Sequence, residues 1–336
     1  MKKRISRRTF TLGAITATVA GAEKAKPGEA KAADFRVTLV TGGLPSVVIV
    51  TADAPTPTAR YAAQELAYHL EKATSGGGAK PTVVTESAIG STGSTGRSAR
   101  VYVGDTRAAR AAGVRFKEID PECCVLRTGQ DALFIAGSDS PDGDPLDVNT
   151  SAGTLFGVYE ILDRFLGVRW LWPGELGVAV PAARVIVVPA LDETIKPRFF
   201  QRHVRPGMGF TSEHPALGFT PKAAAEYAQV QAVFLRRHRM GRGQRVSYGH
   251  AFTDWWEKYG AEHPDWFQLV DGKRGPVKPG TRFSMCPSSQ GLKEELVALW
   301  HAKGGAKPGR YPSFINAVEN DIPGQCECAP SRFLPP

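Results

Sequence analysis

The sequence predicts an α/β protein with an N-terminal α/β sandwich built on a mixed sheet, followed by the first half of a TIM-barrel-like (βα) domain. Three observations lead to this prediction. Short β-branched segments alternate with helical segments from Phe35 to Pro189, which is typical of a layered α/β domain. From Arg198 onward the order becomes strand, loop and helix, repeated, as at the beginning of a TIM barrel. Between them, residues 151–177 join a helix to a short strand that contains two tryptophans.

The segment 151–177 is expected to end the first domain and to carry the surface on which the second domain packs. Its apolar residues are three or four apart and form one helix face; they are Leu155, Val158, Tyr159, Leu162 and Phe165. Gly167 permits a left-handed cap where this helix ends. Trp170 and Trp172 are two apart in the following strand, so they point to the same side. We expect them to pack between the domains, and a sugar-binding stack is the alternative.

The N-terminal domain is expected to span residues 35–190. Apolar, β-branched segments bounded by turn residues predict strands at residues 35–40, 46–50, 81–85, 100–104 and 185–189. Residues 123–127 and 132–136 predict a hairpin. Helices are predicted at residues 58–73 and 106–112, and residues 191–197 are interpreted as a linker. This order gives a mixed sheet with helices packed on it.

The composition argues against a nucleic-acid partner and against a membrane span. The chain has 336 residues, which suits two domains, and no run approaches the ~20 apolar residues of a spanning helix. Its formal charge is +9, but residues 1–32 alone hold eight Lys/Arg and two Asp/Glu. The remainder therefore has 34 basic and 31 acidic residues, which is an ordinary surface.

The first 32 residues are interpreted as an export signal. Ser6-Arg7-Arg8-Thr9-Phe10 resembles the twin-arginine motif, and a weakly apolar run from Thr11 to Ala22 follows it. Cleavage is expected after about residue 22 or 32, where A-x-A-like sites occur. The mature protein should then be periplasmic or secreted. The alternative is a basic disordered tail.

The C-terminal domain is expected to span residues 198–336. Strands are predicted at residues 199–204, 245–248, 283–286 and 313–318, and helices at residues 221–240, 253–259 and 289–303. A complete TIM barrel needs about 250 residues, so this segment corresponds to half of one. Half a barrel has two open sheet edges, and we expect it to self-associate or to be poorly stable alone.

Several motifs together resemble domain-of-unknown-function family 4838, a bacterial family of exported proteins. They are the run at residues 153–177, the HPDWF segment at 263–267, the DGKR segment at 271–274, Asn320-Asp321, and Cys326-Glu327-Cys328. The resemblance covers the chain from about residue 36. It implies an N-terminal domain similar to that of family 67 α-glucuronidases and family 20 hexosaminidases, and a barrel like those of glycoside hydrolases. Ser331 departs from the family pattern C-x-C-x-x-C, and the family barrel continues beyond this length.

Two carboxylates are the candidate catalytic residues. Glu319 and Asp321 follow the fourth predicted barrel strand, and catalytic residues of TIM barrels lie at such strand ends. Alternation along the chain places both side chains on one side. Glycoside hydrolysis needs one protonated and one ionised carboxyl group, and crowding two carboxylates raises the pKa of one. One alternative is a pair that only caps the next turn. Another is that one of them is catalytic and its partner carboxylate lies in the other half of a barrel.

Five residues are candidates for binding the substrate: Arg202, His203, His250, Trp266 and Asn320. His250 follows the second predicted barrel strand and can bond a sugar hydroxyl, or it can cap the helix that follows. Arg202 and His203, with Arg205, can bind the carboxylate of a uronic acid or a sulfated sugar. Salt bridges between domains are their alternative role. Trp266 offers a ring on which a sugar can stack.

The five cysteines fall into two groups. Cys123 and Cys124 begin an apolar strand and are expected to pack in the core. Cys286, Cys326 and Cys328 follow neighbouring predicted strands and are expected to meet as a disulfide or as free thiols. A thiolate metal site is the alternative, but zinc takes four ligands and only three thiols are evident. We therefore expect no metal and no cofactor.

Together these features predict an exported carbohydrate-active protein of the glycoside-hydrolase-like sort. Its partner would be a polysaccharide or an acidic glycan, on which Glu319 and Asp321 act by acid/base chemistry. The competing hypothesis is a non-catalytic glycan-binding or cell-surface module, or a truncated and inactive fragment.

Overall fold

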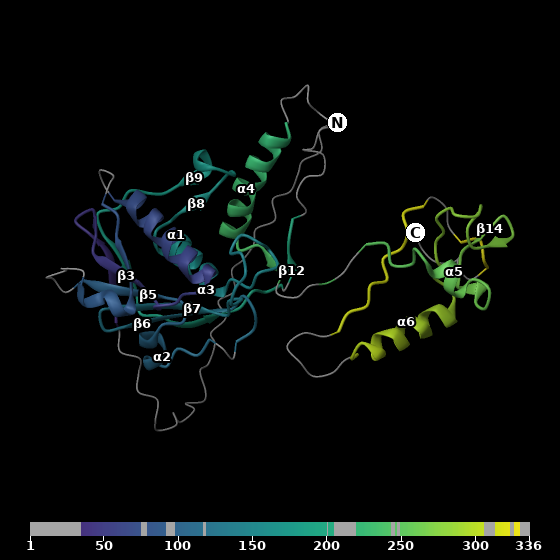
Figure 1. Cartoon of the computed structure of the whole chain (residues 1–336), viewed down its shortest axis with the longest axis horizontal. Coiled ribbons are helices and arrows are strands. Elements are labelled where there is room, and N and C mark those ends of the chain that lie inside the picture. Colours follow the sequence, from purple (N-terminus) through teal and green to yellow (C-terminus); the bar gives the residue numbers. More distant parts are fainter. Residues whose placement is uncertain are drawn as a thin grey trace, which may run out of the picture. The chain divides into compact units, whose positions relative to one another are not determined.

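The computed structural model describes residues 35–74, 79–91, 98–116, 119–199, 201–204, 220–242, 246, 249–305, 313–322 and 326–329 (Figure 1). The predicted export signal at residues 1–32 and Arg205 lie outside these residues. Residues 35–242 and residues 249–329 are described separately below. Within the described part of the chain, no helix has the length and apolar character needed to cross a bilayer.

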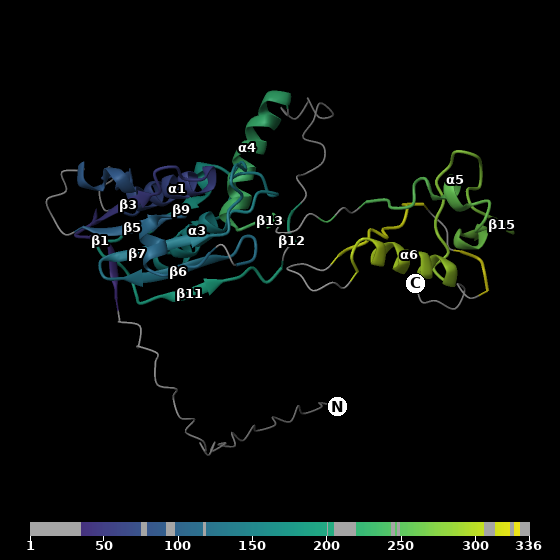
Figure 2. The same ribbon diagram turned by 60° about the horizontal axis from the view of Figure 1, so that its bottom comes forward.

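A six-stranded mixed sheet forms the centre of residues 35–242 (Figures 1 and 2). Its strands, in spatial order, are β11 (Asp192–Ile195), β6 (Cys124–Gly129), β7 (Ala132–Gly137), β5 (Ala99–Val103), β3 (Val47–Thr51) and β4 (Thr82–Thr85). The last four are parallel to one another, whereas β6 and β11 are antiparallel to their neighbours. The central strands are apolar on both faces, as parallel strands covered on both sides must be. The predicted mixed sheet is confirmed.

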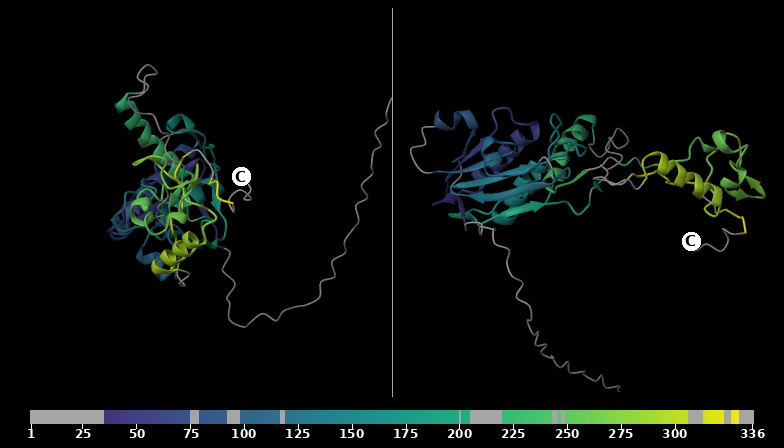
Figure 3. Two further views of the ribbon diagram at one scale, coloured as in Figure 1. Left: turned by 90° about the vertical axis from the view of Figure 1, so that its right-hand side faces the viewer. Right: turned by 90° about the horizontal axis from the view of Figure 1, so that it is seen from below.

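Helices α1 (Pro57–Ala73) and α3 (Gly153–Phe165) cover one face of this sheet. A smaller antiparallel sheet joins them in the same core and consists of β1 (Val37–Thr41), β2 (Leu44–Pro45) and β10 (Ile186–Val188). The other face packs on α2 (Arg107–Ala111), through Ala109, and on Val114 and Phe116. The side chains of β3 and β5 alternate between the two cores, as the period of two in a strand requires. In the right-hand view of Figure 3 the strands form one continuous layer.

Glycines let α3 approach the sheet closely. A Cβ atom on Gly153 would lie 2.1 Å from the carbonyl oxygen of Cys123, and one on Gly157 would lie 2.8 Å from the side chain of Ile135. A Cβ atom on Gly137, at the end of β7, would meet the backbone of Gly153. Small residues here allow the backbone of α3 to rest directly on β6 and β7.

Two elements beyond residue 190 belong to this first group, which differs from the sequence prediction. Residues 192–195, interpreted as a linker, form the edge strand β11. Helix α4 (Pro221–Arg237), predicted as an outer helix of the barrel, places its C-terminal end against α1 and α3. Figure 2 shows this end of α4 near the short strands β12 (Gln201–Arg202) and β13 (Gly241–Arg242), which pair with each other.

The two tryptophans of the segment 151–177 do not share a side. The strand β8 (Arg169–Trp170) pairs with β9 (Val178–Ala179) and ends at Trp170, so the alternation does not continue to Trp172. A 3₁₀ turn, η2 (Glu175–Gly177), precedes β9. Trp170 is buried in the core of the first group, whereas Trp172 is 66% exposed. The expectation of a shared packing face was therefore wrong, because the strand is shorter than predicted.

Residues 249–329 contain a small aromatic core but no barrel strands among the described residues. Their elements are α5 (Trp255–Tyr259), η4 (Pro264–Trp266), the hairpin of β14 (Leu269–Val270) and β15 (Lys273–Arg274), and α6 (Gln290–Ala302). The core consists of Phe252, Trp255, Trp266, Phe267, Phe283, Met285 and Leu292. One further short helix, η1 (Glu86–Ser91), lies in the first group.

The predicted half barrel is not confirmed. The predicted strand at 283–286 forms only one bridge, between Phe267 and Met285, and residues 313–318 form none. Most of the predicted strand at 245–248 lies outside the described residues. The backbone of 283–286 bonds instead to the irregular segment at 266–268, since Cys286 N donates to Trp266 O and Gln268 N donates to Ser284 O.

Candidate functional site

A cavity of about 440 Å³ lies at the carboxyl ends of the parallel strands in the first group. Ala52, Pro55 and Thr56 follow β3, Asp105 follows β5, and Ser138, Asp139 and Pro141 follow β7. Arg110 and Phe116 complete the wall. Because the ends of parallel strands meet at one edge, open α/β sheets commonly bind ligands there. The sequence analysis did not identify this pocket, although its signal was present in the two aspartates that follow strand ends.

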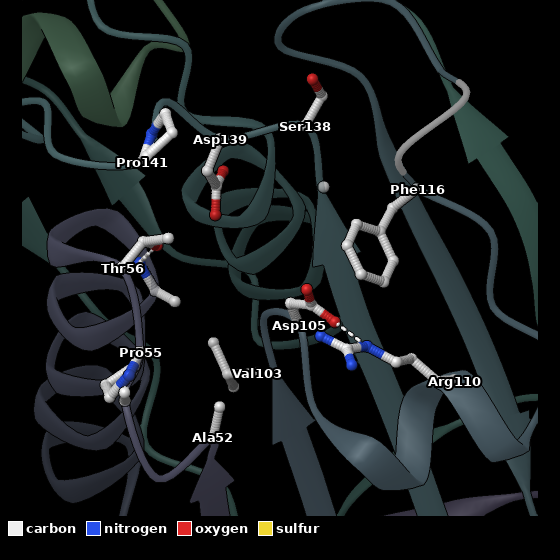
Figure 4. A pocket seen from close by; sticks show the side chains of 13 residues that line it. Ala52, Pro55, Thr56, Val103, Asp105, Arg110, Phe116, Ser138, Asp139 and Pro141 are labelled. Atoms are coloured by element: carbon white, nitrogen blue, oxygen red, sulfur yellow. Dashed lines mark hydrogen bonds and ion pairs between the residues drawn. The ribbon is translucent and has the colours of Figure 1, made fainter.

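Asp139 is the polar side chain that this pocket presents most directly (Figure 4). Its Oδ1 accepts a hydrogen bond of 2.8 Å from the backbone N–H of Thr154, in the first turn of α3. The N-cap residue of that helix, Ala152, has no side-chain acceptor, so Asp139 supplies one. Burial raises the pKa of Asp139 to about 7, against the opposing effect of hydrogen bonds from Thr154 and Thr56. At neutral pH this group therefore exists in both protonation states.

The other polar side chains of the pocket wall bond to residues of the protein itself. Arg110 Nε donates to Asp105 Oδ1, which neutralises both charges, and Figure 4 shows this pair on the side opposite Thr56. Thr56 accepts from Ala59 N and caps α1. Of the two aspartates in the lining, Asp105 is thus paired with Arg110, and Asp139 is bonded to the first turn of α3.

The predicted catalytic residues lie together in residues 249–329. Glu319 Oε2 accepts a hydrogen bond of 3.0 Å from Met285 N, and its Oε1 accepts from Asn320 N at 2.9 Å. Asn320 is buried, and its Nδ2 donates to Phe283 O at 2.6 Å. These bonds fix the loop 319–321 on the segment 283–285. Glu319 and Asn320 therefore act here as anchors.

His250 joins the same loop from a distant part of the sequence. Its Nδ1 donates to the carbonyl oxygen of Glu319 at 3.0 Å, and its Nε2 lies 3.5 Å from Asp321 Oδ2. The Asp321 side chain is 87% exposed. His250, Glu319 and Asp321, which were separate candidates in the sequence, therefore lie together, and of the two carboxylates only that of Asp321 is open to solvent, because Glu319 is bonded to backbone N–H groups.

Arg202 and His203 lie in the first group of elements and make structural contacts there. Arg202 NH2 donates to Glu122 Oε2 at 2.9 Å, and its Nε donates to the backbone oxygen of Arg239. Both nitrogens of the His203 ring lie within 3.2 Å of Arg242 NH2. Arg202 thus has a salt bridge to a buried carboxylate within the first group of elements, whereas the alternative considered for it was a salt bridge between domains.

Trp266 lies in the aromatic core and is 6% exposed. The ring of His263 stacks on it at 4.2 Å between centroids, and Trp255 and Tyr259 contact it as well. Gly291 lies against its Nε1, where a Cβ atom would come within 2.7 Å. Because it is buried, Trp266 does not offer the sugar platform expected from the sequence. From the sequence alone, a tryptophan at this position can be either a sugar platform or a core residue, and only its burial distinguishes the two.

Three cysteines form a separate cluster in residues 249–329. The Sγ atoms of Cys286, Cys326 and Cys328 all lie within 4.8 Å of one another, and all three residues are buried. Cys286 Sγ is 3.5 Å from each of the other two, so no disulfide joins them. The expectation that they meet is confirmed. Cys123 and Cys124 are buried, as predicted, at the beginning of β6.

The chain was compared with protein-family models, curated proteins and solved structures. The chain matches no protein-family model and no curated protein. Among solved structures, one that the chain matches is a 4-O-methyl-α-glucuronidase of glycoside hydrolase family 115, with specificity for decorated arabinogalactans. It has 19% sequence identity and a TM-score of 0.26, and the match covers 46% of this chain and 18% of that enzyme.

Proposed function

We propose that this chain is an exported carbohydrate-active protein that acts on a polysaccharide or an acidic glycan, and that it belongs with the family 4838 proteins that its sequence resembles. The observation that carries the proposal is the contact of His250 with both Glu319 and Asp321. This contact places the imidazole of His250 beside the exposed carboxylate of Asp321. The loop that carries Asp321 is held in place by the hydrogen bonds of Glu319 and Asn320.

The roles of these residues follow from their contacts. Asp321 is the group that touches the sugar, because its carboxylate is open to solvent. An ionised carboxylate can act as a base or nucleophile at an anomeric centre. His250 orients and stabilises it through the 3.5 Å contact when the imidazole is protonated. Glu319 is a positioning residue, since each oxygen accepts a backbone hydrogen bond.

A screen of chromogenic glycosides and a glycan array on the mature protein tests the proposal. Turnover of one glycoside is expected to fall by about 100-fold or more in Asp321→Asn, within the range seen when a catalytic acid or base is removed. Glu319→Gln should lower it less and should also lower thermal stability. Asp265→Asn, at an acidic residue of the same group that bonds Ser289, is the control. Turnover that is unchanged in Asp321→Asn would contradict the catalytic role.

A non-catalytic glycan-binding module is the second candidate, and one observation favours it. Of the two predicted catalytic carboxylates, Glu319 has both oxygens engaged by backbone N–H groups, so it is poorly placed to give a proton to a glycosidic oxygen. A glycosidase needs a protonated acid as well. Glycan binding without turnover, weakened by Asp321→Asn and by His250→Ala, would establish this second function. An array with no bound glycan and no turnover would contradict both.

A further inference from the structure

We propose that Cys286, Cys326 and Cys328 form a site for one Zn²⁺ ion, bound through three thiolates. The three sulfurs come from segments 40 residues apart, namely the end of the segment 283–286 and the segment 326–329. All three side chains are buried beside Leu269. Sulfur ligands gathered from separate segments favour a soft metal such as zinc.

The distances between the sulfurs fit a metal better than a disulfide. A tetrahedral zinc site with Zn–S bonds of about 2.3 Å has sulfurs separated by roughly 3.8 Å. Cys286 Sγ lies 3.5 Å from Cys326 Sγ and 3.5 Å from Cys328 Sγ. A disulfide needs a separation of about 2.05 Å and would join only two of the three. The third separation, between the sulfurs of Cys326 and Cys328, is at most 4.8 Å, so one central ion can reach all three.

The backbone around the cluster holds the sulfurs independently of any bond between them. Leu269 N–H, at the start of the β14–β15 hairpin, donates to Cys326 Sγ at 3.3 Å. The intervening residue, Glu327, donates from its N–H to Leu269 O at 2.8 Å, and its carboxylate accepts from Asp271 N at 3.0 Å. These bonds fix the two cysteines of the C-x-C segment on the hairpin. An N–H donor to a sulfur ligand is the kind of outer contact that orients and stabilises a bound thiolate.

Ser288 marks the position of the fourth ligand. Its Oγ lies 3.1 Å from Cys286 Sγ and 3.1 Å from Cys328 Sγ. Zinc is four-coordinate, and a site with three protein ligands takes water as its fourth. The Ser288 hydroxyl is placed to hold that water by a hydrogen bond. Three thiolates and one water would complete the four ligands of zinc.

The expected role of the ion is structural. The core of residues 249–329 is small and aromatic, and its described helices and strands are short. Small cores of this kind commonly need a metal or disulfides for stability. A zinc ion here would join the hairpin β14–β15, the segment before α6, and the C-x-C segment.

Metal analysis of the full chain tests the proposal. The protein is purified under reducing, oxygen-free conditions, loaded with Zn²⁺ alone, desalted and analysed by atomic emission. We expect one zinc per chain, and loss of that zinc in Cys286→Ser and in Cys328→Ser. Cys123→Ser, at a buried cysteine outside the cluster, is the matched control and should retain the metal. Ser288→Ala should weaken zinc binding by about 10-fold, as the loss of an outer contact does.

Cobalt substitution provides a readout that does not depend on how the variants fold. Co²⁺ bound to the wild-type chain by three thiolates gives intense sulfur-to-metal charge-transfer absorption, whereas Co²⁺ bound by oxygen ligands does not. Its appearance, together with protection of residues 249–329 from protease that a chelator removes, supports the site. A reduced wild-type chain that binds no zinc overturns the proposal. So does a disulfide between two of these cysteines that persists in protein folded with zinc present.

Discussion

Asp139 and His69 are two titratable side chains whose environments make stability depend on pH in opposite directions. Burial raises the pKa of Asp139 to about 7 and lowers the pKa of His69 to about 4. His69 is fixed as the neutral Nδ1–H tautomer, because its Nδ1 bonds to Glu65 O at 2.7 Å and its Nε2 accepts from Trp170 Nε1 at 3.0 Å. Each side chain is therefore neutral in the folded protein over a range of pH in which the same side chain is charged in the unfolded chain.

Asp139→Asn should stabilise the protein at pH 8 but not at pH 4. In the folded state Asp139 keeps its proton up to about pH 7, whereas the unfolded group loses it near pH 3.8, so its contribution to stability is lost as pH rises between these values. Asn stays neutral and keeps an oxygen for Thr154 N–H. Because Asp139 is only half-buried beside a cavity, we expect a gain of about 2 kcal/mol, less than the full pKa difference implies.

The measurement is urea unfolding of both proteins at pH 4 and pH 8. An equal difference in the free energy of unfolding at the two pH values would contradict the raised pKa.

His69→Gln should make stability less sensitive to acid. The unfolded histidine gains a proton as pH falls below about 6.5, while the folded one resists protonation down to about pH 4. The stability that His69 contributes is therefore fully present above pH 6.5. As pH falls from 6.5 to about 4, the free energy of unfolding decreases by on the order of 3 kcal/mol. Gln retains an acceptor for Trp170. The difference between wild-type and variant unfolding free energies, followed from pH 7 to pH 4, should shrink by that amount. A constant difference would show that His69 protonates normally.

At the scale of the element, α4 is attached to the first group of elements by buried charges. Arg237 donates from Nε and NH2 to the two oxygens of Glu65 at 2.9 and 3.0 Å, and Tyr159 OH also donates to Glu65. Arg236 is fully buried and lies over the ring of Phe156. Its guanidinium donates to three backbone oxygens, those of Pro145, Met240 and Thr150.

Just beyond the helix, the side chain of Arg239 donates to the carboxylates of Glu160 and Asp163.

Breaking the buried pair should be costly, whereas breaking an exposed pair on the same helix should not. Arg237→Gln or Glu65→Gln leaves a buried charge without its partner, so each should lower the free energy of unfolding by about 3 kcal/mol. Lys222→Ala, which removes the exposed i,i+4 pair with Glu226, should cost less than about 0.5 kcal/mol. A double-mutant cycle by denaturant unfolding measures the coupling. Coupling near zero would mean that the charges are solvated separately.

The sequence predicted the helices and strands whose apolar residues recur regularly. It did not predict those elements whose formation or position depends on contacts with distant residues. The helices at 57–73, 153–165 and 221–237 and the central strands were predicted, because their apolar spacing is regular. Residues 192–195 read Asp-Glu-Thr-Ile and have no apolar run, so their role as an edge strand depends on pairing with β6. The position of α4 was also not predictable, since its two arginines, Arg236 and Arg237, are of a type common on exposed helix faces and only their contacts show that they are buried.

The candidate site was predictable in part for the same reason. Polar residues after expected strands singled out Glu319, Asn320, Asp321 and His250, but the contact of His250 with Glu319 and Asp321 was not predicted, and those strands are not formed. Which of them is open to solvent depends on backbone N–H donors from Met285 and Asn320, which no side-chain pattern reveals. The burial of Trp266 is likewise a property of its neighbours.

At the scale of the whole molecule, the charge distribution supports an export prediction. The excess of positive charge in residues 1–32 surrounds Arg7-Arg8. Replacing both with Lys should leave the precursor in the cytoplasm, because the twin-arginine route distinguishes the two cations. Fractionation and immunoblotting of the wild-type and variant proteins, expressed in a bacterium with this pathway, provide the measurement. A single variant, Lys2→Arg, is the control, and efficient export of the double variant would exclude this route.

The attachment of α4 also sets an order of events during synthesis. Glu65 leaves the ribosome 172 residues before Arg237, and the carbonyl groups of Pro145 and Thr150 leave about 90 residues before Arg236. Until residue 240 has been made, α1 has no cation for its buried carboxylate. The nascent domain can form its sheet early, but it cannot reach its final compactness until translation has passed well beyond that sheet. A pause in translation between residues 200 and 240 would thus expose an incompletely closed intermediate to proteases and chaperones.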